Sequence, residues 1–420
     1  MTDPGEGAVV TGIGLVTPVG TTLAEVFDAL CTGRSGLRRP PEGHPLAGSA
    51  EVAGIGPDID ATTVLPATEA RTVDRYIVMA MVAAAEALRD AGIVVGRDVD
   101  PYRIACLVSG TGGLATLESQ VVARTRKGRV GVSPYLLPGM LPNMGAARIA
   151  IKYDLRGYSS SIGTACAAGA QSIGEAVRLI RNGEADVVVC GCSEAPLFAT
   201  LADTFGNARA LARGWDDPTA ASRPFDRRRN GLVLAEGAGV LVMERAGHAD
   251  ARGAGGYADL LGWGATTDAY HPTTPRPDGS GAAACMRRAL ADAGISAAEV
   301  GYLNAHGTGT KLGDVAEVVA IRSVFGDDAP PVSSSKAVTG HMLGASGVVE
   351  AAASIEALRR GVLPPTHNLD DPDPSCELDH IRKTPRPAGI DVAVSNSFGF
   401  GGHNISLVFG PPSTHAVRAT

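Results

Sequence analysis

A segment that occurs twice constrains the fold of this chain more than any other feature of its sequence. Residues 87–93 read ALRDAGI, and residues 289–295 read ALADAGI. Both copies end a helix-like pattern with glycine, and both lead through an apolar stretch into Gly-Thr-Gly, at residues 110–112 and 307–309. Matches that keep their order along a chain indicate an internal duplication. We therefore predict two related halves.

A weaker match extends the same duplication. Residues 166–169 (CAAG) open one expected helix, and residues 344–347 (GASG) open another. A polar stretch rich in Gly and Ala, residues 248–256, follows the last strand expected in the first half. We place the boundary there and expect residues 1–250 and 251–420 to be the two halves.

Continuous apolar runs predict strands that are covered on both faces, as in layered α/β folds. The expected strands are residues 7–13, 104–108, 159–162, 186–190, 239–244, 301–304, 332–334, 392–395 and 405–409. The helical patterns between them include residues 75–90, 167–181, 282–293 and 348–360. Because strands and helices alternate, we expect an α/β fold in each half.

Composition excludes several classes of function. The 420 residues carry 37 basic and 44 acidic side chains, a net charge of −7, which argues against a general nucleic-acid-binding protein. The longest uncharged run, residues 130–147, contains Pro134, Pro138 and Pro142, so we do not expect it to span a membrane. The first ten residues lack the basic and apolar regions of a signal peptide. We expect a cytoplasmic enzyme whose seven cysteines are reduced.

Cys166 is the cysteine whose position favours chemistry. It lies between a short expected strand and a long expected helix, within the small residues of GTACAAG. A helix N-terminus stabilises anionic sulfur, so this position predicts an exposed thiol with a lowered pKa. We interpret the remaining cysteines as packing residues; they are Cys31, Cys106, Cys190, Cys192, Cys285 and Cys376. No second Cys or His pair accompanies them to support a metal site.

Two histidines and an aromatic pair lie in other loops rich in glycine. His306 belongs to NAHGTGT, and His341 ends the segment SKAVTGH. Glycines beside a histidine let a ligand approach the ring closely. Phe398 and Phe400 lie in SFGFGG, a loop in which the chain can bend sharply and present backbone N–H groups beside a movable ring. A cysteine nucleophile needs such donors to stabilise an oxyanion or an enolate.

At these residues the sequence resembles the β-ketoacyl-acyl carrier protein synthases of the thiolase superfamily, in particular the chain-elongating, dissociated (type II) members. The motifs are residues 164–166 (TAC), 306–310 (HGTGT), 336–341 (KAVTGH) and 396–402 (NSFGFGG). The resemblance implies a thiolase-like fold with duplicated α/β halves in the layer order α/β/α/β/α.

The resemblance also implies a mechanism. Cys166 would take an acyl chain from an acyl carrier protein, and malonyl-carrier protein would then lose carbon dioxide and attack the acyl group. His306 and His341 would stabilise the enolate as neutral donors, and the backbone N–H groups of Cys166 and Phe400 would form an oxyanion hole. Lys336 would orient the site, with Glu350 as its charge partner. The chain would need no cofactor or metal of its own, because the carrier protein supplies phosphopantetheine.

Further residues are assigned to substrate binding by the same resemblance. Thr308 and Thr310 would line the phosphopantetheine tunnel, and Phe400 would gate the acyl pocket. The other residues expected to bind substrate are Thr111, Phe205, Phe398, Asp268, Glu350 and His403. Two residues depart from the family pattern. His403 stands where threonine is common and has either a structural role or a role in substrate handling. Thr111 stands where isoleucine is common and suggests a specialised acyl chain.

Docking of an acidic carrier protein would need a basic surface on this acidic chain. The densest basic cluster consists of Arg124, Arg126, Lys127 and Arg129. Further candidates for docking are Arg71, Arg75 and Arg209. We expect a homodimer, or a heterodimer with a chain-length-factor homologue that lacks the nucleophile.

Three alternative functions remain at the level of sequence. The chain could be the active ketosynthase subunit of a type II polyketide or polyene synthase, which would condense only with its partner. A hydrolase or simple acyltransferase would use Cys166 without releasing carbon dioxide from malonyl-carrier protein. A non-catalytic interaction protein would tolerate Cys166→Ala.

Overall fold

Each half of the chain contributes five main strands to the structure, a computed structural model that describes residues 7–414. The strands of the first half are β1 (Ala8–Val16), β4 (Ile104–Ser109), β5 (Ser159–Ser160), β6 (Val187–Glu194) and β7 (Gly237–Arg245). Those of the second half are β8 (Ala258–Thr267), β9 (Tyr302–Asn304), β10 (Val332–Ser333), β13 (Ala393–Gly399) and β14 (His403–Gly410).

The two sets of strands have the same spatial order. The first half runs β1-β7-β6-β4-β5, and the second runs β8-β14-β13-β9-β10. In each half the first two pairings are antiparallel and the last two are parallel. A short antiparallel contact between β1 and β8 joins them into one ten-stranded sheet. The duplication predicted from the sequence is thus confirmed by the topology.

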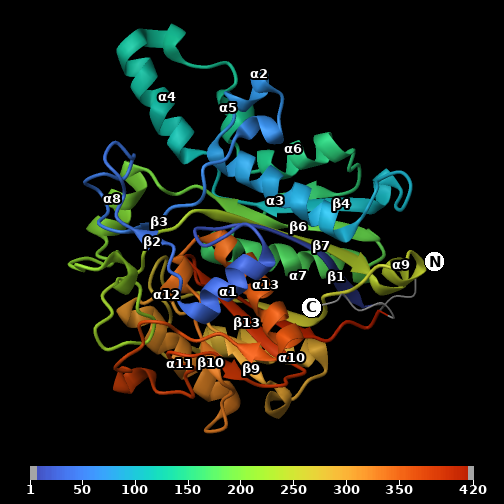
Figure 1. Cartoon of the computed structure of the whole chain (residues 1–420), viewed down its shortest axis with the longest axis vertical. Coiled ribbons are helices and arrows are strands. Elements are labelled where there is room, and N and C mark those ends of the chain that lie inside the picture. Colours follow the sequence, from blue (N-terminus) through green and yellow to red (C-terminus); the bar gives the residue numbers. More distant parts are fainter. Residues whose placement is uncertain (1–6, 415–420) are drawn as a thin grey trace.

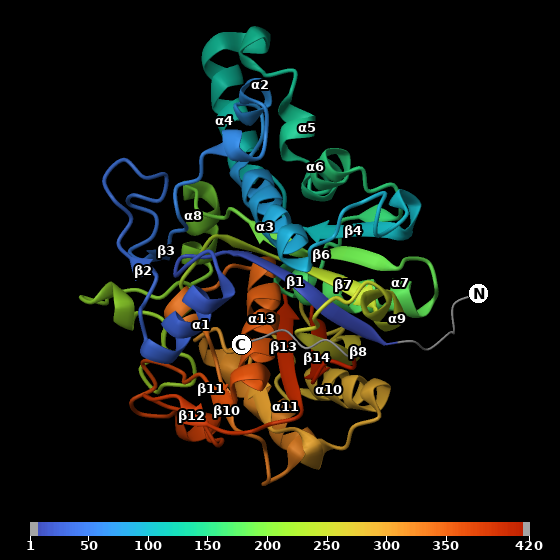
Figure 2. The same ribbon diagram turned by 45° about the vertical axis from the view of Figure 1, so that its right-hand side comes forward.

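Helices lie in three layers around these strands, with two central helices between the halves (Figures 1 and 2). The outer helices of the first half are α3 (Arg75–Ala91) and α6 (Met144–Tyr153), and those of the second half are α10 (Ser280–Ala293) and α11 (Lys311–Phe325). The central pair is α7 (Ala168–Arg181) and α13 (Gly344–Arg360), which pack against each other and against strands of both halves. This gives the expected layer order, α/β/α/β/α.

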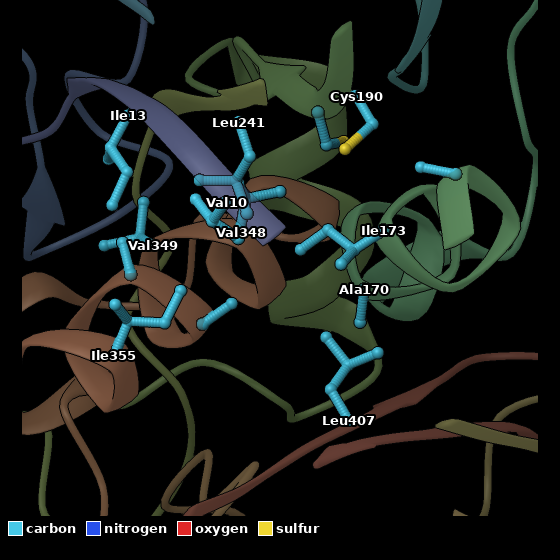
Figure 3. Close-up of a cluster of buried hydrophobic side chains, with 14 of the residues drawn as sticks. Val10, Ile13, Ala170, Ile173, Cys190, Leu241, Val348, Val349, Ile355 and Leu407 are labelled. Carbon is cyan, nitrogen blue, oxygen red and sulfur yellow. The ribbon is translucent and has the colours of Figure 1, made fainter. Parts of the chain in front are cut away.

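The central layer holds a large apolar core (Figure 3). Ile173 of α7 and Val348 of α13 are fully buried there, together with Leu241 of β7 and Leu407 of β14. The two helices approach so closely that a Cβ on Gly169 would lie 2.3 Å from the carbonyl oxygen of Gly344. Small residues at these helix starts therefore set the distance between the two halves.

The sequence-based expectations missed one strand of this sheet. β8 pairs with both β1 and β14, yet no strand was predicted over its residues. Its apolar run is interrupted by Asp259, Gly262 and Gly264. The glycines are needed because α10 crosses this strand closely, and a Cβ on Gly262 would lie 2.3 Å from the Ala293 nitrogen. β8, which corresponds to β1 in the second half, was therefore not predicted, because the glycines that its packing requires interrupt the apolar pattern.

The remaining elements are shorter or peripheral. They are α1 (Leu23–Thr32), α2 (Ala67–Ala70), α4 (Leu114–Lys127), α5 (Leu136–Met140), α8 (Ala199–Asn207), α9 (Ala246–Ala251), α12 (Lys336–Thr339), β2 (Leu37–Arg38), β3 (Ala53–Gly54), β11 (Val362–Leu363) and β12 (Arg386–Pro387). Helix α4 projects from the body of the molecule and has no buried residue (Figure 1). Within residues 7–414, no helix is both long and apolar enough to cross a membrane.

Candidate active site

Cys166 lies at the entrance to helix α7, as the sequence predicts. It is the middle residue of a short 3-10 helix, η4 (Ala165–Ala167), that continues directly into α7. The preceding residue, Ala165, has a φ of +49°, a left-handed conformation that costs a non-glycine residue free energy. Cys166 is only 9% exposed, so the expectation of an exposed thiol is wrong.

The expected lowering of the thiol pKa is also wrong. Burial, and then the nearby Glu194 carboxyl group, raise the pKa of Cys166 to about 12. Lys336 and the backbone N–H groups of Phe400 and Cys166 act in the opposite direction but do not outweigh burial. The helix N-terminus alone is therefore a poor guide to this thiol, because it says nothing of how deeply the sulfur is buried.

The loop rich in glycine is the tight connection between β13 and β14, which form a hairpin. It brings the backbone N–H of Phe400 near the sulfur of Cys166, and this group and the N–H of Cys166 itself both act to lower the pKa of the thiol. The Phe400 side chain is 43% exposed and stacks on Phe205, with ring centroids 5.9 Å apart. The structure thus presents an N–H group on one side of the bend and an aromatic ring on the other.

His306 and His341 come from two loops of the second half and meet edge to face. Their ring centroids are 5.3 Å apart with an interplanar angle of 84°. Burial, and then the charge of Lys336, hold the pKa of both rings well below the usual histidine value, so both are neutral at pH 7.

The hydroxyl group of Ser346 is a hydrogen-bond partner of the His341 ring. The Ser346 hydroxyl accepts the backbone N–H of Met342 at 2.9 Å and lies 3.3 Å from Nδ1 of His341. If the hydroxyl donates to Nδ1, the ring proton is on Nε2. Nδ1 of His306 is buried and has no hydrogen-bond partner among the described residues.

Behind the histidines lies a buried ion pair. Lys336 and Glu350 have side chains that are each 1% exposed and are bonded to each other. The same ammonium group donates to the carbonyl oxygen of His306, and the Ser335 hydroxyl donates to Glu350 at 3.1 Å. The expected charge partner of Lys336 is therefore confirmed. Burial raises the pKa of Glu350, and Lys336 opposes that shift.

Two acidic residues that the sequence-based interpretation missed hold the His306 loop from the other side. Glu317 accepts the backbone N–H groups of His306 and Gly307 at 2.8 and 2.7 Å, and Asp314 accepts that of Gly309 at 3.1 Å. Burial raises the pKa of Glu317 to about 7. Both acids lie on α11 directly after the HGTGT segment and are buried. Two acids on one helical turn next to a candidate loop were the signal available in the sequence.

One pocket brings the candidate residues of both halves together. Cys166, His306 and His341 line a space of about 820 Å³, which includes its opening to solvent. Other predicted residues on its wall are Thr308, Thr310, Phe205, Phe398, Phe400 and Asp268. The nucleophile of the first half therefore faces the histidines of the second.

Three predicted substrate-binding residues do not line this pocket. Glu350 lies behind Lys336. Thr111 is exposed, and its hydroxyl donates to Glu194 at 3.0 Å. His403 begins β14 opposite Gly399, and its ring lies against Gly401.

The predicted docking residues differ in their availability. Arg71 and Arg209 are exposed, as are the four cations at the end of α4 and in η3 (Gly128–Gly131), namely Arg124, Arg126, Lys127 and Arg129. Arg75 instead forms an ion pair with the buried Glu236 at 2.8 Å and donates to the carbonyl oxygen of Pro57. Arg75 is thus partly exposed, but its guanidinium group is already paired with a buried carboxylate. No group of three or more potential metal-ligating side chains occurs within the described chain.

A buried cysteine that faces two neutral histidines, at the junction of two α/β halves with the same strand order, defines a condensing enzyme of the thiolase-like class. The first part of the chain, residues 6–249, matches the model of the beta-ketoacyl synthase N-terminal domain. Residues 257–370 match that of the C-terminal domain. The chain therefore belongs to the beta-ketoacyl synthase family.

Known relatives and solved structures are similar over nearly the whole chain. The 3-oxoacyl-[acyl-carrier-protein] synthase 2 of Synechocystis is 42% identical over 404 residues, which are 96% of this chain and 97% of that protein. The synthase 2 of Vibrio harveyi is 41% identical, with the same shares covered. A structure of a type II polyketide synthase ketosynthase in complex with its acyl-carrier protein has a TM-score of 0.90 at 32% identity, covering 97% of this chain and 100% of that one. The ishigamide ketosynthase/chain length factor has a TM-score of 0.89 at 33% identity, covering 97% and 99%.

Proposed function

We propose that this chain condenses an acyl group held on Cys166 with malonyl-acyl carrier protein, releasing carbon dioxide and forming a β-ketoacyl-carrier protein. The observation that carries the proposal is the shared pocket of Cys166, His306 and His341. A hydrolase needs a nucleophile and one base, whereas a pair of neutral donors opposite a nucleophile suits an enolate.

In the first step the sulfur of Cys166 attacks the thioester of the incoming acyl-carrier protein. The carbonyl oxygen becomes an oxyanion, which the backbone N–H groups of Cys166 and Phe400 stabilise. The bond between the acyl carbon and the carrier sulfur breaks, and the proton of the Cys166 thiol leaves on the carrier thiol. Phe400, exposed and stacked on Phe205, is placed to move as the acyl chain enters.

In the second step malonyl-carrier protein loses carbon dioxide, and the electron pair of the broken bond passes to the thioester as an enolate. His306 and His341 donate to the enolate oxygen, which requires the neutral state that their burial enforces. The enolate carbon then bonds to the acyl carbon, and the bond to the Cys166 sulfur breaks. One proton from solvent restores the thiol.

Lys336 and Glu317 are positioning residues in this scheme. Lys336 binds the carbonyl oxygen of His306, and Glu317 binds its backbone N–H. The ring of His306 is thereby anchored through its own backbone on both sides. Thr308 and Thr310, which line the same pocket, are proposed to contact the phosphopantetheine arm.

Similar proteins support the proposed partners and setting. The relatives at 41–42% identity are named 3-oxoacyl-[acyl-carrier-protein] synthase 2. One neighbour at 32% identity is a type II polyketide synthase ketosynthase solved with its acyl-carrier protein, and one at 33% is a ketosynthase/chain length factor. We propose a cytoplasmic dimer that docks an acyl carrier protein on exposed arginines such as Arg209. We also propose halves at 1–250 and 251–420, whose first and last six residues lie outside the described residues.

The second candidate function is the active ketosynthase subunit of a type II polyketide synthase. The likeness to polyketide ketosynthases favours it, while the higher identity to the synthase 2 relatives favours fatty acid elongation. The test is condensation by the chain purified alone, with acyl- and malonyl-carrier protein, read by product mass. Activity only after addition of a second homologous chain would replace the fatty acid assignment, and acyl loss without carbon dioxide release would overturn condensation itself.

A further inference from the structure

Arg276 is the one arginine or lysine among the residues that line the active-site pocket in the described part of the chain. It lies on the loop between β8 and α10. Its side chain is 40% exposed, whereas Cys166 is 9% and His341 is 2% exposed. The cation therefore stands at the solvent end of the pocket, and the reacting groups stand at its buried end.

The backbone around Arg276 is held in place. Its N–H donates to Asp268 at 3.0 Å, and the other oxygen of Asp268 accepts the amide of Asn404 at 2.7 Å. Pro275 and Pro277 flank it and restrict the backbone further. These contacts tie the loop to the hairpin that carries Phe400, so the position of Arg276 is fixed relative to the reaction site.

The guanidinium group of Arg276 is oriented by its neighbours, but not all of its N–H donors are hydrogen-bonded. Its Nε donates to the two oxygens of Asp278 at 3.0 and 3.1 Å, and the group lies over the Tyr270 ring at 5.9 Å from the ring centroid. Its two terminal nitrogens make no hydrogen bond to any residue within 7–414. Asp278 is 57% exposed, so the pairing is weak and leaves the positive charge available.

We propose that Arg276 binds the phosphate of the phosphopantetheine arm on which the carrier protein presents its acyl and malonyl groups. The inference rests on the proposed function, since the carrier-bound substrates that it assigns have such an arm. The two free terminal nitrogens of a guanidinium match the oxygens of a phosphate in a bidentate arrangement. The thioester end reaches Cys166 and the histidines, and the phosphate end remains at the exposed rim.

The carboxylate of the malonyl group is the other anion that enters this pocket. A cation that bound it would stabilise the carboxylate in the ground state, before its electron pair passes to the enolate and neutral carbon dioxide leaves, and would slow the reaction. That carboxylate must also lie near His306 and His341, at the buried end. Position and chemistry therefore both favour the phosphate as the partner of Arg276.

The test compares two small substrates, malonyl-phosphopantetheine and malonyl-pantetheine, which differ only in the phosphate. For carbon dioxide release by the wild-type protein, we expect kcat/KM to be at least about tenfold higher with malonyl-phosphopantetheine than with malonyl-pantetheine. The difference should arise from a lower KM. Arg276→Gln should remove this preference and leave kcat unchanged, and Arg276→Lys should retain part of it. Arg287→Gln is the matched control, because Arg287 lies on α10 and binds Ser323 outside the pocket.

A second readout does not depend on turnover. S-Methyl phosphopantetheine, whose blocked thiol cannot consume the reagent, should protect Cys166 from alkylation at about tenfold lower concentration than S-methyl pantetheine in the wild type, and at equal concentration in Arg276→Gln. A preference that survives Arg276→Gln in both readouts overturns the inference. So does an equal loss with both malonyl compounds, which would place Arg276 on the malonyl group. If the wild type releases carbon dioxide from no malonyl substrate, the proposed function fails, and the protection assay alone decides the role of Arg276.

Discussion

The two halves of the molecule share a strand order but not a chemistry. At the start of α7 the first half carries Cys166, and at the corresponding start of α13 the second half carries Gly344. In the second half, the loop after β9 carries His306. The matching Gly-Thr-Gly loop after β4 carries no histidine; its Thr111 hydroxyl donates a hydrogen bond to the Glu194 carboxyl group. In the proposed mechanism each half therefore supplies one part of the reaction, and the pocket between them brings both parts together.

The largest expected effect comes from removing the part that the first half supplies. Cys166→Ala should lower condensation by roughly 10³-fold or more, because Cys166 is the one cysteine that lines the pocket among residues 7–414. The histidines remain intact, so carbon dioxide release from malonyl-carrier protein should continue. Product mass and carbon dioxide measured on the same sample check both statements. Full condensation by Cys166→Ala would mean that the two halves do not divide the reaction in this way.

The reciprocal change is in the second half. His306→Ala or His341→Ala should lower carbon dioxide release by about 10²- to 10³-fold, the usual cost of losing one donor to a developing oxyanion. Acyl transfer to Cys166 should change little, because its proposed oxyanion donors are the backbone N–H groups of Cys166 and Phe400, not the histidines. Intact-mass analysis after incubation with acyl-carrier protein measures the transfer separately. An equal loss in both steps would show that the histidines also serve the first half.

Gly344 offers a test of how closely the halves must approach. A Cβ there would lie 2.7 Å from the sulfur of Cys192 and 3.1 Å from both the Ala165 carbonyl oxygen and the Glu194 carboxylate. Gly344→Ala should therefore lower the free energy of unfolding by about 1–3 kcal/mol, the usual cost of overpacking. Denaturant unfolding measures it, with Gly389→Ala as control because a Cβ on Gly389 meets no atom within 4 Å. Equal stability of the two variants would contradict the close approach.

The same comparison shows what a sequence can and cannot predict here. The duplication, the strand-to-helix position of Cys166 and the pairing of Lys336 with Glu350 were all accessible, because local patterns and motif resemblance carry them. The strand β8 was hidden by Asp259 and its glycines. Glu317 was missed although its signal was local, because Asp314 and Glu317 lie on one turn of the helix that follows the HGTGT segment. The pKa of Cys166 was predicted in the wrong direction because burial, which the local pattern does not encode, raises it.

The pKa of Cys166 gives a smaller and graded test. Because that pKa is raised to about 12, alkylation of Cys166 should rise with pH throughout the neutral and alkaline range. Glu194, whose own pKa burial raises to about 7, is negative above that pH and opposes the thiolate. Glu194→Gln should lower the pKa of Cys166 and speed alkylation by a few-fold at pH 8–9. Glu184 is exposed, and Glu184→Gln should leave the alkylation rate unchanged. Equal rates in the two variants would show that Glu194 does not influence the pKa of Cys166.

Thr111 is the position at which the sequence and the structure give different expectations, and its effect should be the smallest. The sequence predicts that Thr111→Ile improves the use of medium saturated acyl chains, through apolar contact with the chain. In the structure the Thr111 hydroxyl donates to Glu194 and lowers the pKa of that carboxyl group. Loss of the hydroxyl should then raise the pKa of Glu194 and speed Cys166 alkylation near pH 7 by about twofold, in the same direction as Glu194→Gln.

Thr111→Val separates these two explanations, because valine has nearly the volume of threonine but no hydroxyl. If Thr111 acts through Glu194, the valine and isoleucine variants should change alkylation equally and leave the preference for acyl chain length unaltered. If the isoleucine variant alone shifts activity toward medium saturated chains, Thr111 contacts the acyl group directly. Rates with a series of acyl-carrier proteins of increasing chain length distinguish the outcomes. In the second case the loop after β4 would bind substrate just as its counterpart after β9 does, and the two halves would differ less than the pocket suggests.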